Sequence, residues 1–215
     1  MLSKRLKAIA SLIPKNDNII DIGCDHALLD IYLTLNNNNS CIAADISEKV
    51  INCAQKNINN YKLQNKIQTV VSDGISNIEI KNKSTIVISG MGTHTILEIV
   101  SKINKNKINK MIIQSNNNLY KLRKGINKLG YKIELEQVVY DKNKYYTIIV
   151  FTIGEKKYKK NELKYGANYI KNNDYIEYVN YLINKNNRIY SQLNNKHTLE
   201  KIKLKYENYI LKKHI

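Results

Sequence analysis

The 215-residue sequence contains no tryptophan, one proline, one phenylalanine and three arginines. Its cysteines are Cys24, Cys41 and Cys53, and no two of them form a CxxC pair. Such spacing, without an apolar signal segment at the start, is typical of reduced thiols, so we expect a cytoplasmic protein and no bound metal. No apolar run approaches the roughly 20 residues that span a bilayer, so we expect no membrane partner.

Acidic residues are also scarce. The chain has 35 Lys and Arg against 18 Asp and Glu, a net charge of +17, and a field of this sign attracts polyanions such as nucleic acids. Residues 154–215 carry 14 basic and 6 acidic side chains, whereas residues 1–153 carry 21 and 12. A solubilising lysine surface would have the same composition, so the charge alone leaves both interpretations open.

What the chain does contain is a regular alternation of short apolar runs and amphipathic segments. The apolar runs predict strands at 18–22, 40–44, 67–71, 85–88 and 110–113. The segments between them predict helices at 27–35, from Ser47 onward, at 94–104 and at 119–129. Two β-rich runs, 131–140 and 145–152, predict a hairpin. This order predicts an α/β fold, a Rossmann-like class I methyltransferase sheet with a terminal antiparallel hairpin.

The pattern changes after Gly154. Apolar and tyrosine side chains recur three and four residues apart over 175–193 and again over 199–210. This spacing predicts two long helices packed as an antiparallel, coiled-coil-like hairpin. We therefore predict an α/β domain at 1–153 and a small C-terminal α-helical domain at 154–215.

The stretch Ile19–Ala27 carries the strongest functional signal, because a buried strand ends there in Asp21 and a glycine turn. Gly23 adopts backbone angles that other residues resist and lets a ligand approach the main chain. About 20 residues on, Asp45 ends the next apolar run, where such folds bind the two ribose hydroxyls. The pattern predicts an adenosine-containing cofactor. Only Gly23 of the GxGxxG sequence usual in nicotinamide-dependent dehydrogenases is present, which disfavours that cofactor.

Five short motifs follow one another along the chain: Ser3–Leu6, Asp21–Ala27, Ser72–Gly74, Ser89–Gly92 and Gln114–Asn116. In this order and spacing the sequence resembles the bacterial tRNA adenine-22 N1-methyltransferase family over most of its length. The resemblance implies S-adenosylmethionine as cofactor, tRNA as partner and N1 of adenine 22 as methyl acceptor. The chain departs from the usual residues of the family at five positions, with Cys24 for Ser, Asp30 for Pro, Asp45 for Glu, Thr93 for Gly and Ser115 for Pro.

The resemblance also implies the members of the site. The expected cofactor-binding residues are Asp21, Gly23, Cys24, His26, Asp45, Ile46, Asp73, Gly74, Gly90 and Met91. The expected substrate-binding residues are Arg5, Gly92, Thr93, Asn116, Arg123 and Tyr146. From their positive charge, we further expect phosphate contacts at Arg5, Lys4, Arg123 and the lysines at 156–160, and we expect the basic region 154–215 to bind tRNA.

Asp25 is the expected catalytic residue. Adenine N1 has an in-plane lone pair, so no proton must leave before it attacks, and the product is a cation. A carboxylate beside the base would orient the exocyclic amine and stabilise the developing charge, or would accept a proton from the amine.

Three alternatives remain open at this point. The first is another RNA adenine methyltransferase that acts at a different position or on ribosomal RNA, although the Asp/Asn-Pro-Pro-aromatic loop usual in N6 enzymes is absent. The second is a non-catalytic RNA-binding protein that keeps the fold. The third, a small-molecule methyltransferase, agrees poorly with the charge.

Overall fold

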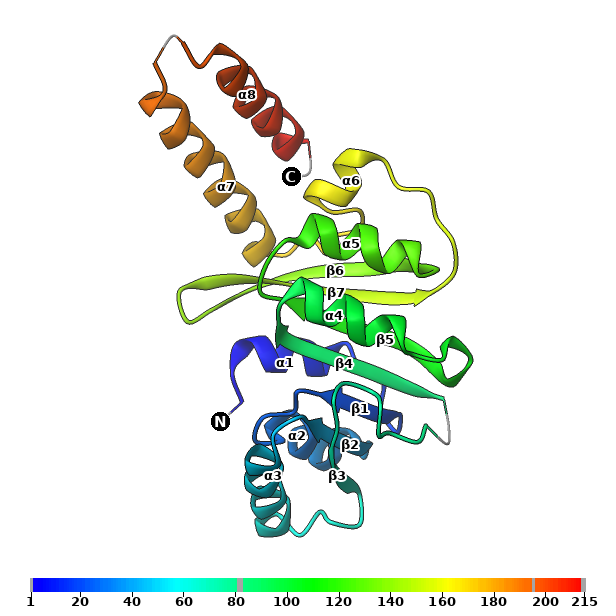
Figure 1. Cartoon of the computed structure of the whole chain (residues 1–215). Coiled ribbons are helices and arrows are strands. Elements are labelled where there is room, and N and C mark those ends of the chain that lie inside the picture. Colours follow the sequence, from blue (N-terminus) through cyan, green and yellow to red (C-terminus); the bar gives the residue numbers. More distant parts are fainter. Residues whose placement is uncertain (1, 81–82, 195, 214–215) are drawn as a thin grey trace.

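The protein is built around a seven-stranded sheet in a computed structural model that describes residues 2–80, 83–194 and 196–213 (Figure 1). The strands are β1 (Asn18–Ile22), β2 (Ser40–Asp45), β3 (Ile67–Val71), β4 (Ser84–Met91), β5 (Ile108–Ser115), β6 (Tyr131–Asp141) and β7 (Lys144–Ile153). They lie in the order β3-β2-β1-β4-β5-β7-β6. β1 to β5 run parallel, and β7 pairs antiparallel with both β5 and β6. The predicted Rossmann-like methyltransferase sheet with a terminal hairpin is confirmed.

Helices cover both faces of this sheet. They are α1 (Lys4–Ser11), α2 (Leu28–Asn37), α3 (Glu48–Asn60), α4 (Thr93–Ser101) and α5 (Leu119–Lys128), with a 3-10 turn, η1 (Lys105–Lys107), before β5. Apolar side chains of α1, α2 and α3 pack on Ile19, whereas those of α4 and α5 pack on Ile20. Because side chains alternate along a strand, a continuous apolar run such as that of β1 is buried on both faces.

The order of the strands reverses direction between β1 and β4. The first crossover, by way of α2, places β2 on one side of β1, and the later chain places β4 on the other. Loops at the carboxyl ends of two such strands diverge to opposite faces, and the crevice between them is where open α/β sheets bind ligands. The fold therefore predicts a ligand site formed by the residues after Ile22 and around Met91.

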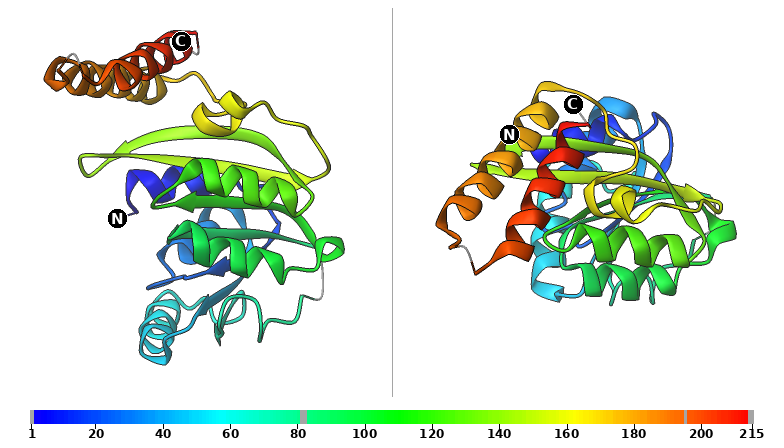
Figure 2. Two further views of the ribbon diagram at one scale, coloured as in Figure 1. Left: turned by 45° about the horizontal axis from the view of Figure 1, so that its top comes forward. Right: turned by 90° about the horizontal axis from the view of Figure 1, so that it is seen from above.

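The C-terminal region contains α6 (Lys160–Tyr165), α7 (Asn173–Gln192) and α8 (Thr198–Lys212). α7 and α8 lie side by side, as the view from above in Figure 2 shows, and they lie beyond the β6 edge of the sheet, as Figure 1 shows. They contact the sheet where Tyr175, Val179 and Leu211 pack against Val138 and where Tyr178 and Tyr181 pack against Tyr145. The two predicted helices are confirmed, and their coiled-coil character stays a prediction.

One part of this region differs from what the sequence suggests. The short helix α6 was not expected, and the segment around it packs on the edge of the sheet. The hydroxyl of Tyr158 accepts a hydrogen bond from the N–H of Ile133 at 2.7 Å, and the backbone of Glu136 bonds to Asn168 and Ile170 at 2.8 Å each. The chain thus stays attached to the sheet for more than a dozen residues after β7, and only α7 and α8 extend away from it.

Candidate active site

A cavity of about 300 Å³ lies at the carboxyl ends of β1 and β4. Its lining comes from α1, the β1–α2 turn, α2 and the end of β4: Arg5, Leu6, Asp21, Gly23, Cys24, Asp25, His26, Leu28, Leu29, Ser89, Gly90 and Met91. A second cavity, of about 530 Å³, adjoins it and shares Arg5 and Gly90 with it. We call them the inner cavity and the outer cavity. Most of the motif residues quoted from the sequence therefore meet at one place.

Gly23 sets the shape of the inner cavity. Its φ is +80°, and a Cβ built on it would lie 2.4 Å from the terminal methyl carbon of Met91. The positive φ disfavours any residue with a side chain, and a Cβ would displace the Met91 methyl group, so the glycine lets the turn after β1 contact the end of β4. The N–H groups of Gly23 and Cys24 both donate to the carbonyl of Ala44, at 2.8 and 3.0 Å, which fixes the turn to β2.

Carboxylates surround this turn at different depths. Asp21 is 4% exposed at the end of β1, and burial is the main cause that raises the pKa of its carboxyl. Asp25 and His26 lie at the mouth instead, with side chains 76% and 52% exposed and 3.4 Å between Asp25 Oδ1 and His26 Nε2. The backbone of Asp25 has a positive φ of +51°, which is uncommon for a residue other than glycine. The inner cavity therefore has an acidic floor and an acidic rim.

The remaining predicted cofactor residues lie along the same edge, after β2 and β3. Asp45 is half-buried, and its Oδ1 accepts a hydrogen bond from the N–H of Ser47 at 3.0 Å. Ile46 is 70% exposed, and Asp73 is exposed too. Gly74 has a φ of +62°, and a Cβ there would lie 2.9 Å from Ile99 Cγ1. These residues do not line the inner cavity, but they extend the edge beyond it in the direction of β3.

The outer cavity gathers three predicted substrate residues around Gly90. Asn116 Nδ2 donates to the carbonyl of Gly90 at 2.6 Å, and the Arg5 guanidinium lies 5.3 Å from the centre of the Tyr146 ring. Gln114 connects them, because its Oε1 accepts from Arg5 Nη1 at 2.6 Å and from the N–H of Gly90 at 3.1 Å. Gln114 was not among the predicted site residues. Its signal was a polar side chain, here 1% exposed, at the end of an apolar strand.

Comparison with known proteins agrees with this geometry. A family model described as a methyltransferase domain matches residues 2–149. A Mycoplasma genitalium protein named "Putative tRNA methyltransferase MG248" is 36% identical over 163 residues, which cover 74% of this chain and 73% of the relative. The tRNA (adenine(22)-N(1))-methyltransferase of Bacillus subtilis is 30% identical over 159 residues, which cover 72% of this chain and 66% of the relative. The chain belongs to this methyltransferase family.

Solved structures of the family superpose over nearly the whole chain. The TrmK of M. capricolum, in complex with S-adenosyl-homocysteine, has a TM-score of 0.82 at 33% identity and covers 100% of this chain and 97% of its own. Streptococcus pneumoniae Sp1610, in complex with S-adenosyl-L-methionine, has a TM-score of 0.82 at 26% identity and covers 99% of both chains. The resemblance stated from the motifs is therefore confirmed.

Two departures from the usual residues of the methyltransferase family contact each other. The hydroxyl of Thr93 lies 2.9 Å from that of Ser115, and both are within 2.9 Å of the carbonyl of Asn117. Thr93 is 3% exposed, and its N–H donates to Asn117 Oδ1 at 3.0 Å. The structure thus places Thr93 in the junction between the β4 and β5 loops. Neither Thr93 nor its neighbour Gly92 lines the inner or the outer cavity.

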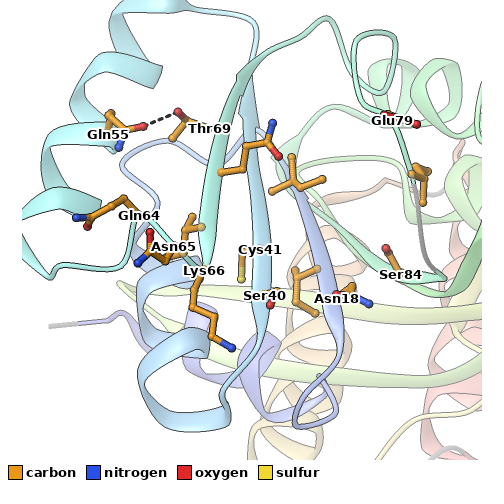
Figure 3. A pocket seen from close by; sticks show the side chains of 15 residues that line it. Asn18, Ser40, Cys41, Gln55, Gln64, Asn65, Lys66, Thr69, Glu79 and Ser84 are labelled. Atoms are coloured by element: carbon orange, nitrogen blue, oxygen red, sulfur yellow. Dashed lines mark hydrogen bonds between the residues drawn. The ribbon is translucent and has the colours of Figure 1, made fainter.

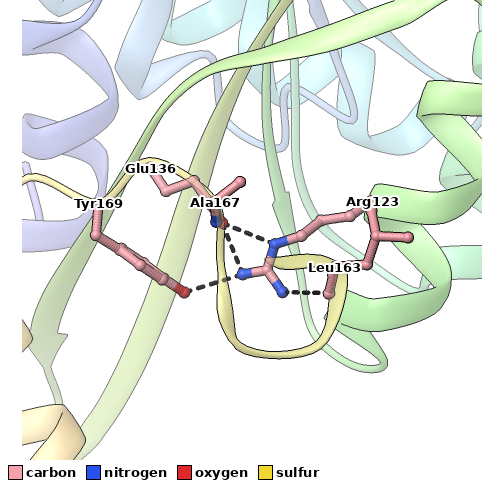
Figure 4. Close-up of polar contacts among 5 residues, drawn as sticks. All are labelled: Arg123, Glu136, Leu163, Ala167 and Tyr169. Atoms are coloured by element: carbon pink, nitrogen blue, oxygen red, sulfur yellow. Dashed lines mark hydrogen bonds and ion pairs between the residues drawn. The ribbon is translucent and has the colours of Figure 1, made fainter. Parts of the chain in front are cut away.

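The structure also gives Arg123 a role other than the phosphate contact expected from the sequence. Its side chain is 1% exposed and forms an ion pair with Glu136, with 2.6 Å between Nη2 and Oε2 (Figure 4). Nη2 also donates to the Tyr169 hydroxyl at 2.9 Å, Nε donates to Glu136 Oε2 at 2.8 Å, and Nη1 donates to the carbonyl of Leu163 at 3.1 Å. Glu136 Oε1 in turn accepts from the N–H of Ala167 at 2.6 Å. Buried in this cluster, Arg123 instead ties α6 and the segment after it to the sheet.

A larger cavity of about 710 Å³ opens at the other end of β1, β2 and β3. Figure 3 shows amide and hydroxyl side chains around it, among them Gln55 and Thr69, which hydrogen-bond each other at 2.7 Å. It lies at the amino ends of parallel strands and shares no lining residue with the inner cavity. In the described parts of the chain, no cluster of His, Cys, Asp and Glu could hold a metal ion. Within the same parts, no helix is long and apolar enough to cross a membrane.

Proposed function

We propose that this protein transfers a methyl group from S-adenosylmethionine to N1 of adenine 22 in tRNA. The observation that carries the proposal is the pair of adjoining cavities. One lies at the β1/β4 switch point, where the methyltransferase fold binds its cofactor, and the other opens from it at Gly90 and has a basic, aromatic lining. The names of relatives at 36% and 30% identity support tRNA as the substrate class.

The residues of the inner cavity fit this cofactor. S-adenosylmethionine carries an ammonium and a sulfonium, and when bound it supplies an electrophilic methyl group. Asp30 and Asp45 are the acidic groups that act on Asp21, and Arg5 is the cation that opposes them, so the floor favours a cationic ligand. Asp21 would accept from the ammonium, and Asp45 would accept from the ribose hydroxyls. The exposed Ile46 and Asp73 would meet the adenine.

The outer cavity fits a purine base. Tyr146 offers an aromatic face for stacking, which is worth about 1–3 kcal/mol per base in proteins that bind single strands. Asn116 presents an amide beside Gly90. Asp25 lies at the exposed mouth of the inner cavity and would orient the exocyclic amine, stabilise the cationic product or accept a proton. Because a folded tRNA stacks its bases, the target adenine must be extracted to reach this depth.

Cations and aromatic rings continue outward from the outer cavity. Lys142 and Lys144, at the tip of the β6–β7 hairpin, line the cavity and are exposed. Beside them, Tyr145 packs its ring against Tyr178 and Tyr181 of α7, with ring centres 5.4 and 5.6 Å apart. We propose that this path from the hairpin to the helical pair carries the flanking tRNA backbone. Phosphate contacts there would offset the cost of extracting the base.

The test is methyl transfer from labelled S-adenosylmethionine to unmodified total tRNA, followed by nucleoside analysis. We expect 1-methyladenosine, and no product from a transcript in which adenine 22 is replaced by guanine. Asp25→Ala should retain cofactor binding and lose at least about 100-fold in turnover, the usual size of such contributions. Glu155→Gln, at an exposed carboxylate outside both cavities, is the matched control.

Other outcomes separate the alternatives. Methylation of adenine at another position, or of ribosomal RNA only, would retain the enzyme class and reject the target. Tight RNA binding without cofactor binding would indicate a non-catalytic RNA-binding protein. For the proposed tRNA path along the β6–β7 hairpin, the double variant Lys142→Ala/Lys144→Ala should raise the KM for tRNA and leave cofactor affinity unchanged. An unchanged KM would reject the hairpin as a phosphate contact.

A further inference from the structure

Asp30 is a buried carboxyl for which the proposed reaction has no role. It lies in the first turn of α2, is 0% exposed, and has no hydrogen-bond partner for either carboxyl oxygen among the described residues. Burial raises the pKa of its carboxyl, and its own backbone, the thiol of Cys41 and the carboxyl of Asp21 act against that rise. Buried polar groups are almost always satisfied, so an unsatisfied carboxyl beside a ligand cavity requires an explanation.

The alternation of β1 explains why Asp21 faces Asp30. Ile19 packs on the α1–α3 side of the sheet, and Asp21, two residues later, points to the same side. α2 follows the glycine turn and covers that face, so its first turn brings Asp30 next to Asp21. The two carboxyls are therefore neighbours, and Asp21 alone lines the cavity.

Two ionised carboxylates cannot share such a place, because both are acceptors only and their charges repel. Burial raises the pKa of Asp30 to about 7. Burial, and then the charge of Asp30, raise the pKa of Asp21 as well. A proton held between the two oxygens converts the repulsion into a hydrogen bond, as in other buried carboxyl pairs. The pair therefore retains a proton near neutral pH.

The other groups that face the pair do not supply that proton or replace it. From β2, Asp45 adds negative charge, and from α1, Arg5 opposes it. The Arg5 guanidinium is also occupied by Gln114 and stacked near Tyr146. Burial raises the pKa values of the Cys24 and Cys41 thiols, so both are neutral and add no charge.

We infer that Asp30 is a positioning residue that shares a proton with Asp21, and that binding of the cofactor's ammonium displaces a proton from this pair into solvent. The inference rests on the proposed function, because it assigns the ammonium to Asp21. When both carboxyls are protonated, the arriving ammonium favours the ionised Asp21, one proton leaves, and Asp30 retains the other and donates it to Asp21. The affinity for the cofactor is then highest at a pH above the range in which the pair takes up its second proton, and it decreases as the pH falls through that range.

The experiment measures S-adenosylhomocysteine binding by calorimetry between pH 6 and pH 8, in buffers that differ in ionisation enthalpy. This ligand carries the same ammonium without the sulfonium charge. For the wild type we expect a Kd about tenfold weaker at pH 6 than at pH 8, the change that one pH-unit shift in a titration produces. We also expect release of a proton on binding at pH 6, a readout that needs no variant.

Asp30→Asn supplies the comparison, because its amide still donates to Asp21 but does not titrate. The Kd of this variant should change less than about twofold over the same range, because Asp21 then ionises at lower pH. Glu155→Gln should retain the wild-type profile. The ligand amine titrates alike in all three proteins, so differences between the curves report the pair.

Two results would overturn the inference and leave cofactor binding intact. One is a wild-type Kd that is flat from pH 6 to pH 8 without proton release, and the other is an Asp30→Asn profile that matches the wild type. Absence of S-adenosylhomocysteine binding to the wild type at any pH would instead overturn the proposed function, and the inference with it.

Discussion

Two buried carboxylate clusters in this molecule have opposite surroundings. Glu136, behind α5, is matched by Arg123 and accepts a further hydrogen bond from the Ala167 N–H. Asp21 and Asp30, behind the inner cavity, face each other and lack a buried cation of their own. A buried charge is tolerated where its partner is permanent, and there it fixes structure. Where the partner is missing, the protein retains a place for a ligand's charge and for a proton.

The largest effect is expected from a variant that breaks the ion pair of Arg123 with Glu136. Arg123→Ala leaves the Glu136 carboxylate buried without its cation, and such a loss typically costs about 3–5 kcal/mol of folding free energy. The measurement is urea unfolding of the full chain. Lys124→Ala, at the exposed neighbouring position, is the control and should change little. A loss below about 1 kcal/mol in Arg123→Ala would show that the cluster does not hold the C-terminal region to the sheet.

The next variant tests whether the shape of the inner cavity, rather than the charge of Asp21 and Asp30, determines cofactor binding. Gly23→Ala places a Cβ 2.4 Å from the Met91 methyl carbon at a φ of +80°. We expect a loss of about 2 kcal/mol in stability, because alanine is strained at this φ, and of more than about tenfold in cofactor affinity, because the Met91 side chain that lines the cavity must move. For stability Gly92→Ala is the control, since its φ is −74° and its nearest neighbour, Asn117 Nδ2, is 3.8 Å away. Equal losses in both variants would contradict the role given to Gly23.

A smaller effect is expected on how stability depends on pH, because Asp30 holds a proton in the fold. The pKa of an unfolded Asp is about 3.9, and that of Asp30 in the fold is raised to about 7. Between these values the folded protein binds more protons than the unfolded one, so this pair lowers stability as the pH rises. Compared with the wild type, Asp30→Asn should therefore gain about 1–2 kcal/mol between pH 5 and pH 8. Urea unfolding at both pH values measures it, and a difference that does not change with pH would reject the shared proton.

The smallest effect concerns an ion pair outside both clusters. Lys164 of α6 bonds Glu207 of α8, with side chains 37% and 17% exposed. Solvent screens such pairs, so Glu207→Gln should cost less than about 1 kcal/mol and lose less in high salt. Thermal unfolding at two salt concentrations checks this. A cost as large as that of Arg123→Ala would mean that burial does not separate the two classes of ion pair.

The sequence predicted the sheet because its signals are local. The apolar run of each parallel strand, bounded by turn residues, marks a strand buried on both faces, and the bounds of β1 and β3 agree with the expected 18–22 and 67–71. The expected site residues at the ends of β1 and β4 meet for the same reason, since the carboxyl ends of parallel strands share one edge.

The parts that were not predicted depend on contacts between distant segments. A glutamate at 136 within an alternating strand resembles a solvent-facing residue, and nothing near it in the chain shows that Arg123 will bury it. The same holds for Asp30, whose neighbour Asp21 is recognised only after α2 is placed on β1. Helix α6 has six residues and is too short for a clear apolar period, so its place against the sheet was missed as well.

The contact between Thr93 and Ser115 has a consequence for exchanging segments with relatives. Their hydroxyls lie 2.9 Å apart and both lie within 2.9 Å of the Asn117 carbonyl oxygen, so the two loops form one packing unit. Substitutions within such a unit are not additive. A chimaera that takes residues 89–93 from a relative but keeps 114–117 from this chain therefore combines two halves of different units. The two positions must be transplanted together, although 21 residues separate them in the sequence.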